Sequence, residues 1–510
     1  MNEVSYYDLS GGINLAVTKT ELGLNTKKIY WADAENIEIL ANKGIAKQKG
    51  NAIFYELDEK EKITGIFEMV SKPNNKLVIT TDSGKVYIYD KQKDNTVTLD
   101  KEIKGKKPKF VNFLNGVAVI SESDGLFYIK DSNENSYEVV ECELKDSSEK
   151  LVTDAVMAVY RGRIFVAHES TIYYSALGTY DDFETEQDAG YIRDFHTDTD
   201  VITALKPYKD YLAIYKRNKV YLLSGVSPAD FAITPFADKG SYSADAIVNV
   251  DNKQYFLSDG IFALEQVGEL NQIQLGSEIT SNIRPEFEKF TYNGLKESFC
   301  VHYPKKNQVW YFFVYNNKEK AFHTIWINDY VNKAWFKRII PQNITCAALF
   351  NGDILTADDN GYIYKEDTGN TFNGDAIEFL WKSPFLAITQ AHHRKTIDEF
   401  YFILDSSYDN DFNFSIYKDY DSEFSDDSEH IFCFHQEHFV WGDDSDEAGE
   451  NEVWPLDNAS IPIWAINTDV MEKAEISESN YSIQLCVEGR DIINSCAIIG
   501  LHFKEIYNDD

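Results

Sequence analysis

A short hairpin pattern occurs seven times in the chain, and this repeat constrains the fold more than any other feature. Residues 76–90, KLVITTDSGKVYIYD, contain an apolar run, a polar turn and a second run in which tyrosine alternates with aliphatic residues. The same order returns in six later segments, 116–131, 162–176, 210–225, 253–266, 307–330 and 352–367. Their starts are 40, 46, 48, 43, 54 and 45 residues apart. A period of about 45 residues is typical of the four-stranded blade of a β-propeller.

The repeats therefore predict an all-β fold with a β-propeller of six to eight blades over residues 56–369. Each hairpin supplies two strands of a blade, and weaker segments such as 200–205 and 245–250 supply others. Residues 1–55 are expected to form an extended N-terminal arm and the first strands. The alternative is a row of unrelated hairpins in sandwiches, and the even spacing favours the propeller. The segment 281–290, SNIRPEFEKF, is the best candidate for a short helix.

The C-terminal part of the chain has a different pattern. After about residue 369 the period is lost, and longer alternating runs such as 375–388 and 396–407 predict a second, sandwich-like β-domain over residues 370–510. Residues 401–510 contain 26 acidic and four basic side chains, so this segment alone carries −22 of the net charge of −35. A protein that grips nucleic acid through phosphates needs clustered lysine and arginine, so the composition argues against such binding.

No sequence pattern singles out a catalytic, cofactor-binding or metal-binding residue. The acidic pairs Asp181–Asp182 and Asp198 with Asp200 are expected by chance in a chain with 84 acidic residues. The histidine clusters, His392–His393 and His435 with His438, favour surface or strand-edge positions. The acidic loops 421–430 and 442–450 are interpreted as solvated faces, with weak cation binding as the alternative. We therefore expect a protein that is not an enzyme and carries no cofactor.

Cysteine usage and the ends of the chain bear on location. The six cysteines are scattered without a CxxC pair, which favours buried free thiols over zinc or disulfides. No apolar run reaches the length of a membrane span, and the opening MNEVSYYDLSGG lacks the features of a secretory signal. We expect synthesis in a cytoplasm.

The order of several motifs resembles a known family. The opening 6–17, YYDLSGGINLAV, is followed by 32–51, ADAENIEILANKGIAKQKGN, and later by 160–183, 200–233, 255–264, 328–339 and 358–369. In this order they resemble the β-propeller tail proteins of short-tailed bacteriophages, namely the nozzle or tail tubular protein B and the related tail-hub, or packaged-DNA stabilisation, proteins. The resemblance covers most of residues 5–405. The acidic segment that follows has no counterpart in the pattern.

The resemblance implies a virion structural protein rather than a catalyst. Six copies would form a ring below the portal and the adaptor, or head–tail connector, close the DNA channel, and conduct DNA during ejection. Tail fibres or cargo proteins are further partners that it implies. It also implies assembly in the host cytoplasm, a place in the phage tail, and transient contact with passing DNA without specific binding. The alternatives are a secreted or surface propeller that binds or hydrolyses glycans, and an intracellular WD-type scaffold.

The acidic C-terminal segment has two interpretations under this resemblance. Part of it could face a channel, where negative charge repels phosphate and lets DNA slide. Alternatively, the charge only keeps a virion component soluble. Both remain hypotheses at the level of sequence.

Overall fold

The computed structural model describes residues 2–24, 27–133, 136–193, 200–268, 272–315, 323–388, 393–405, 407–420, 428–433, 470–474 and 480–509. The chain divides into two compact units. One contains Lys49–Gly374, and the other combines Met1–Gln48 with Asp375–Asp510. Strands dominate both units, which confirms the predicted all-β class.

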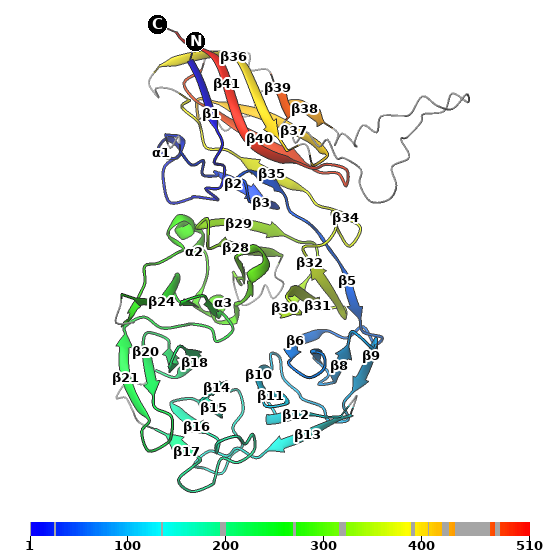
Figure 1. The fold of residues 1–510 in the computed structure, drawn as a ribbon, viewed down its shortest axis with the longest axis vertical. Helices are drawn as coiled ribbons and strands as arrows, with labels where there is room; N and C mark the ends of the chain where they lie inside the picture. Colours follow the sequence, from blue (N-terminus) through cyan, green and yellow to red (C-terminus); the bar gives the residue numbers. More distant parts are fainter. Residues whose placement is uncertain are drawn as a thin grey trace, which may run out of the picture. The chain divides into compact units, whose positions relative to one another are not determined.

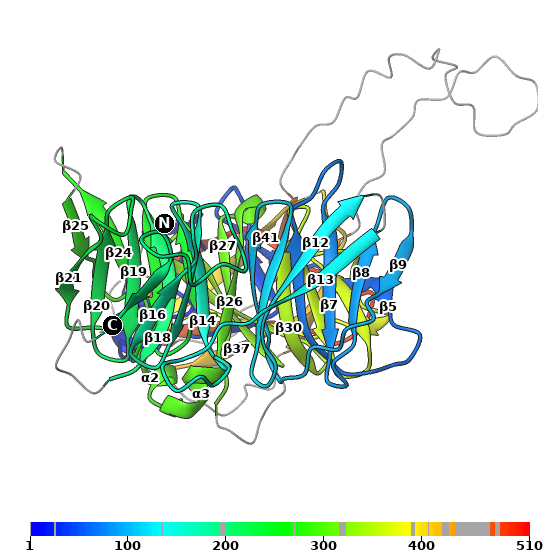
Figure 2. The ribbon, with the colours of Figure 1, turned by 90° about the horizontal axis from the view of Figure 1, so that it is seen from below.

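Residues 49–374 form a β-propeller of seven blades. Seven antiparallel sheets, each built on four neighbouring strands, follow one another along the chain and surround a common centre (Figure 1). Figure 2 shows the same strands from the edge of the ring. The count lies within the predicted six to eight.

In each blade the four strands follow one another from the axis outwards. The first contains β6 (Ile63–Met69), β7 (Lys76–Thr81), β8 (Val86–Asp90) and β9 (Asn95–Thr98). The second contains β10 (Lys109–Phe113), β11 (Gly116–Ser121), β12 (Gly125–Asn133) and β13 (Ser136–Cys142). The third contains β14 (Val156–Tyr160), β15 (Arg163–His168), β16 (Thr171–Tyr174) and β17 (Gly190–Ile192). The fourth contains β18 (Ile202–Tyr208), β19 (Tyr211–Lys216), β20 (Val220–Ser224) and β21 (Ala232–Ala237).

The remaining blades follow the same plan. The fifth contains β22 (Ile247–Val250), β23 (Lys253–Leu257), β24 (Ile261–Val267) and β25 (Gln272–Leu275). The sixth contains β26 (Phe299–Tyr303), β27 (Gln308–Phe312), β28 (Thr324–Asp329) and β29 (Ala334–Ile339). The seventh contains β30 (Ile344–Phe350), β31 (Asp353–Asp358), β32 (Tyr362–Glu366) and β5 (Asn51–Glu56). The short strand β33 (Thr371–Phe372) pairs with β5 in parallel, through Phe372 and Asn51.

The seven predicted hairpins are the second and third strands of the seven blades. In the first, Leu77 lies opposite Tyr89 and Thr80 opposite Val86. Gly84 closes the turn at a φ of 94°, a backbone conformation that glycine adopts without steric cost. Apolar side chains then pack between neighbouring blades: Val78 of blade one belongs to the same buried cluster as Val117 of blade two.

The ring is closed by a strand from the other end of the sequence. β5 pairs with β32, so that Ala52 lies opposite Lys365 and Asn51 opposite Glu366. This differs from the predicted division, which assigned residues 1–55 to an N-terminal arm and first strands and began the propeller at residue 56. Strand pairing across more than 300 residues is invisible to a local pattern, and it draws β5 into blade seven.

The second unit contains two antiparallel sheets. One has the order β3 (Ile37–Ile39), β4 (Ile45–Lys47), β41 (Ala497–Asp509), β36 (Arg394–Leu404) and β39 (Val470–Ala474), with β1 (Asn2–Tyr6) also paired to β41. The other has the order β2 (Asp33–Glu35), β35 (Phe379–Lys382), β40 (Ile483–Gly489), β37 (Asn410–Lys418) and β38 (Ser428–Cys433). Phe402 of the first sheet packs against Phe412 and Phe414 of the second, with ring centroids 5.4 and 5.3 Å apart. The unit is thus a sandwich that needs both ends of the chain, whereas the sequence pattern placed it in residues 370–510 alone.

Helices are few and short. They are α1 (Lys19–Gly23), η1 (Ser281–Ile283), α2 (Arg284–Phe287), α3 (Tyr292–Glu297) and η2 (Pro304–Lys306), and the strand β34 (Asp375–Ala376) completes the elements. The predicted short helix corresponds to η1 and α2. None of the helices in the described part of the chain has the length and apolarity that crossing a bilayer requires.

Candidate functional site

One cavity of the propeller lies along its axis. It has a volume of about 590 Å³ and is lined by the innermost strands of all seven blades, β6, β10, β14, β18, β22, β26 and β30, together with residues just before β10 and β22. We call this cavity the axial channel. Because the blades repeat one meander, their innermost strands run in the same direction, so the strand starts gather at one end of the channel and the strand ends at the other.

Most of the channel wall is apolar. Phe67 and Phe110, from blades one and two, stack with ring centroids 5.3 Å apart. Leu205 and Val301 continue the wall on other blades. An apolar wall interrupted by a few polar groups is the usual lining of a small-molecule site.

Two ion pairs cross the channel where the innermost strands begin. Lys109, the first residue of β10, pairs with Asp245, just before β22. Lys107 donates to the carbonyl oxygen of Glu297 at 2.7 Å and lies 3.4 Å from its carboxylate. Blade two is separated from blade five by two blades on one side and three on the other, so the first pair spans the channel rather than joining neighbours.

The charged groups at this end influence one another. Burial alone would raise the pKa of Asp245, but Lys109, Lys107 and Lys206 outweigh it and lower that pKa. Burial lowers the pKa of Lys107, against the opposing effect of Glu297 and Asp245. The three lysines therefore favour the ionised form of Asp245, while burial disfavours the charged form of Lys107.

Lys206 is the fifth of the seven residues of β18, and its side chain lies within electrostatic range of Asp245. Its side chain lines the channel and is half-buried. It lies close enough to Asp245 and Cys300 to lower the pKa of both. No described residue makes a hydrogen bond or ion pair with the Lys206 Nζ. We refer to Lys107, Lys109 and Lys206 as the channel lysines.

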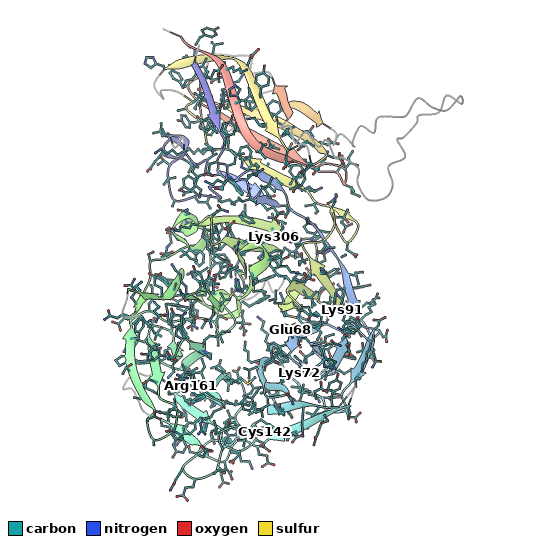
Figure 3. All side chains as sticks on the ribbon, viewed as in Figure 1. Glu68, Lys72, Lys91, Cys142, Arg161 and Lys306 are labelled. Carbon is teal, nitrogen blue, oxygen red and sulfur yellow. The ribbon has the colours of Figure 1, made fainter. Side chains whose placement is uncertain are left out.

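Neutral and acidic side chains lie at the other end of the channel. Glu68, near the end of β6, is labelled at the inner side of the ring in Figure 3. Its carboxylate accepts hydrogen bonds from the Asn75 side chain and the Asn351 backbone, both at 2.9 Å. Its backbone carbonyl accepts from Asn112 at 2.9 Å. Through these hydrogen bonds Glu68 connects blades seven, one and two.

Two cysteines line the channel between its ends. Burial raises the pKa of Cys300 and of Cys346 to about 12. A thiol with so high a pKa is a poor nucleophile at neutral pH. Elsewhere Cys142, Cys486 and Cys496 are buried free thiols.

The acidic pairs noted in the sequence have local structural roles where they are described. Asp182 accepts hydrogen bonds from the backbone of Thr185 and Glu184 at 2.9 and 3.1 Å, which lower its pKa together with the bond from the Thr185 hydroxyl. The Asp200 carboxylate accepts from Asn218 at 3.3 Å, and Asp198 lies outside the described residues.

The histidine and loop candidates are only partly described. His392, His435 and His438 lie outside the described residues, as do the loop 442–450 and residues 421–427. His393 is half-buried just before β36. Within the described ranges, no group of three or more His, Cys, Asp or Glu side chains is placed to hold a metal ion.

The channel lysines were not singled out from the sequence, although a signal for two of them exists. The run 104–109, KGKKPK, contains four lysines in a chain with a net charge of −35. The run directly precedes β10 and overlaps its first residue, which places Lys107 and Lys109 at the channel.

Comparison with known proteins identifies no family. No family model and no curated protein matches the chain. Similar solved structures include the Pan2 WD40 domain of Neurospora crassa, with 10% identity, a TM-score of 0.40, and coverage of 65% of this chain and 98% of that one. BamB from Moraxella catarrhalis has 12% identity and a TM-score of 0.38, covering 64% of this chain and 92% of that one. A chain of the mitotic checkpoint complex has 9% identity and a TM-score of 0.39, covering 63% and 93% respectively.

Proposed function

We propose that the chain is a structural subunit of a short-tailed phage virion, forming the nozzle or hub ring that closes the DNA channel below the portal and adaptor. The sequence resemblance suggests this role, and one structural observation supports it. The two N-terminal segments that carry the resemblance lie against each other: Lys43 forms an ion pair with Asp8 at 2.9 Å, and the Leu9 N–H donates to the Lys43 carbonyl at 2.9 Å. The motif residues thus build the sandwich, as expected for a family defined by architecture.

The DNA path in this proposal runs between copies of the chain and not along the axial channel. Spread over a five-residue strand of about 17 Å, a volume of 590 Å³ corresponds to a mean width of roughly 7 Å. A DNA duplex is far wider, because its major groove alone measures about 12 Å. The ion pair between Lys109 and Asp245 crosses the channel as well. A ring of several copies is therefore needed to make a conduit.

The charge of the chain is compatible with a conduit that DNA passes without binding. With 84 acidic against 49 basic residues, the surface is predominantly negative and repels phosphate. The channel lysines are directed inside the propeller, where a duplex does not reach. We therefore expect no measurable DNA affinity at physiological salt.

Mass photometry of the purified protein, alone and with its candidate adaptor, tests the proposal. A hexamer, or a monomer that assembles into six copies on the adaptor, is the expected result. A stable monomer that ignores the adaptor would contradict it. If that monomer also binds glycans in an array, the secreted or surface propeller becomes the better assignment. Electrophoretic mobility shift with duplex DNA is the accompanying control, and a shift at physiological salt would argue against the conduit.

A further inference from the structure

We propose that the axial channel is a binding site for a small organic phosphate, whose phosphate group contacts Lys206 and the neighbouring channel lysines while its apolar part lies against the channel wall. This role is independent of the virion assembly proposed above. It concerns a cavity inside one subunit, and the ligand class follows from the lining residues.

The first support is a local excess of positive charge in the axial channel, although the chain as a whole is strongly negative. The three channel lysines line the channel together with Asp245, and Glu297 pairs with Lys107 from outside the lining. The protein as a whole has the opposite balance. Lys109 is neutralised by Asp245 and Lys107 by Glu297, which leaves Lys206 as the cation without an ion-pair partner among the described residues.

The second support is the partial burial of two of the channel lysines. Lys206 and Lys107 are half-buried in a channel with an apolar wall, and burial lowers the pKa of Lys107. Charged groups in such surroundings are stabilised by an opposite charge that makes direct hydrogen bonds. A phosphate dianion supplies two negative charges and several acceptor oxygens, so it can contact more than one ammonium group. A monocarboxylate supplies only one negative charge and fewer acceptor oxygens.

The third support is the size and lining of the cavity. Its volume of about 590 Å³ lies within the range of about 300–1,000 Å³ that small-molecule sites occupy. The wall on the two blades that flank β18 includes Val156, Met157 and Val248, which are partly exposed and offer an apolar surface to the body of a ligand. Inorganic phosphate alone would leave this surface unused, so an organic phosphate should bind more tightly.

Isothermal titration calorimetry with phenyl phosphate tests the site on the full-length protein. We expect saturable binding with one site per chain, weaker binding of inorganic phosphate, and no heat with benzyl alcohol. Lys206→Gln should weaken phenyl phosphate binding by about tenfold, since it removes one charge-assisted hydrogen bond. The matched control is Lys93→Gln, which makes the same charge change at an exposed lysine in the turn between β8 and β9.

A second variant moves the affinity in the opposite direction. Asp245→Asn removes the carboxylate that competes with phosphate for Lys109, so phenyl phosphate should bind more tightly than to the wild type. Circular dichroism melts check that each variant is folded. Absence of binding to the wild type, equal affinities of Lys206→Gln and Lys93→Gln, or inorganic phosphate binding as tightly as phenyl phosphate would each overturn the proposal.

Discussion

At the scale of single residues, one buried ion pair holds the closing strand of the propeller. Arg338 of β29 and Glu366 of β32 are paired at 2.6 Å, with side chains 2% and 0% exposed. The same guanidinium donates to the backbone carbonyls of Lys49 and Gly50 at 2.6 and 3.0 Å. The Glu366 carboxylate also accepts from the Asn51 side chain at 3.1 Å. Blades six and seven and the strand that closes the ring therefore share one network.

Glu366→Gln should destabilise the propeller strongly. The amide keeps the shape of the side chain but leaves the Arg338 charge buried without its counter-ion, which costs about 3–5 kcal/mol. Urea unfolding followed by tryptophan fluorescence measures the loss. Glu141→Gln, at the exposed pair with Lys101, is the matched control and should leave the unfolding midpoint almost unchanged.

The apolar double variant Arg338→Met with Glu366→Leu separates charge from packing. Because it removes both charges together, it should be more stable than Glu366→Gln alone. An unfolding midpoint of Glu366→Gln equal to that of the wild type would show that the pair does not hold the ring closed.

A second residue-scale prediction concerns pH. Glu61 lies between β5 and β6. Burial raises its pKa, but hydrogen bonds from Ser83 and Lys85 in the first hairpin outweigh this effect and lower the pKa from 4.5 to about 2. A lowered folded-state pKa adds stability that is complete above about pH 4.5 and is lost as the pH falls towards 2.

The stability difference between the wild type and Glu61→Gln should therefore shrink with acidification. By pH 3 more than half of the contribution at pH 6 should be gone, because the unfolded carboxyl is already protonated there while the folded one is not. Urea melts of both proteins at pH 6, 4.5 and 3 measure this. A difference that stays constant over these values would mean that the folded-state pKa of Glu61 is not lowered.

At the scale of elements, Gly11 of the N-terminal motif allows close packing of the backbone. A Cβ on Gly11 would lie 2.2 Å from the carbonyl oxygen of Ile29, whose position is fixed by the hydrogen bond that it accepts from the Gly11 N–H at 2.9 Å. Gly11→Ala should cost about 2–3 kcal/mol, since backbone must move to relieve the overlap.

Hydrogen–deuterium exchange locates the effect of Gly11→Ala. The amides of Leu9, Gly11, Ile29 and Trp31, which are all hydrogen-bonded in this region, should exchange faster. Gly178→Ala is the control: its Cβ would meet nothing within 4 Å, so only the positive φ of 72° opposes it, at about 1 kcal/mol. Unchanged protection of these four amides in Gly11→Ala would refute the packing role of the motif.

Elements whose strands are neighbours in sequence were predictable, and those that join distant segments were not. The segment 76–90 contains both strands of its hairpin and the glycine, Gly84, that its turn requires. The local sequence is therefore enough to predict this hairpin. Residues 51–56 have the same strand character, but nothing in them identifies β32 as the partner. The candidate site shows the same limit. The basic run at 104–109 can be recognised in the sequence, but the pairing of Lys109 with Asp245, 136 residues later, arises only when the ring closes.

At the scale of the whole molecule, the net charge sets how copies of the chain can associate. Each copy carries −35, and about two thirds of that charge comes from residues 401–510. Like-charged subunits repel one another over roughly a Debye length, about 10 Å at 0.1 M salt and 3 Å at 1 M. A ring of such subunits has to be held by apolar and hydrogen-bonded contacts that act against this repulsion.

The proposed ring should therefore assemble more readily as salt is added. Sedimentation velocity at 50, 150 and 500 mM NaCl, at fixed protein concentration and pH 7, should show a rising fraction of the largest species, because screening weakens the repulsion but leaves apolar contacts intact. Sucrose at matched density controls for the density of the solution. Lowering the pH towards the sequence pI of about 4.6 should act in the same direction as salt. Dissociation at 500 mM NaCl would instead mean that complementary ion pairs between acidic and basic side chains hold the copies together.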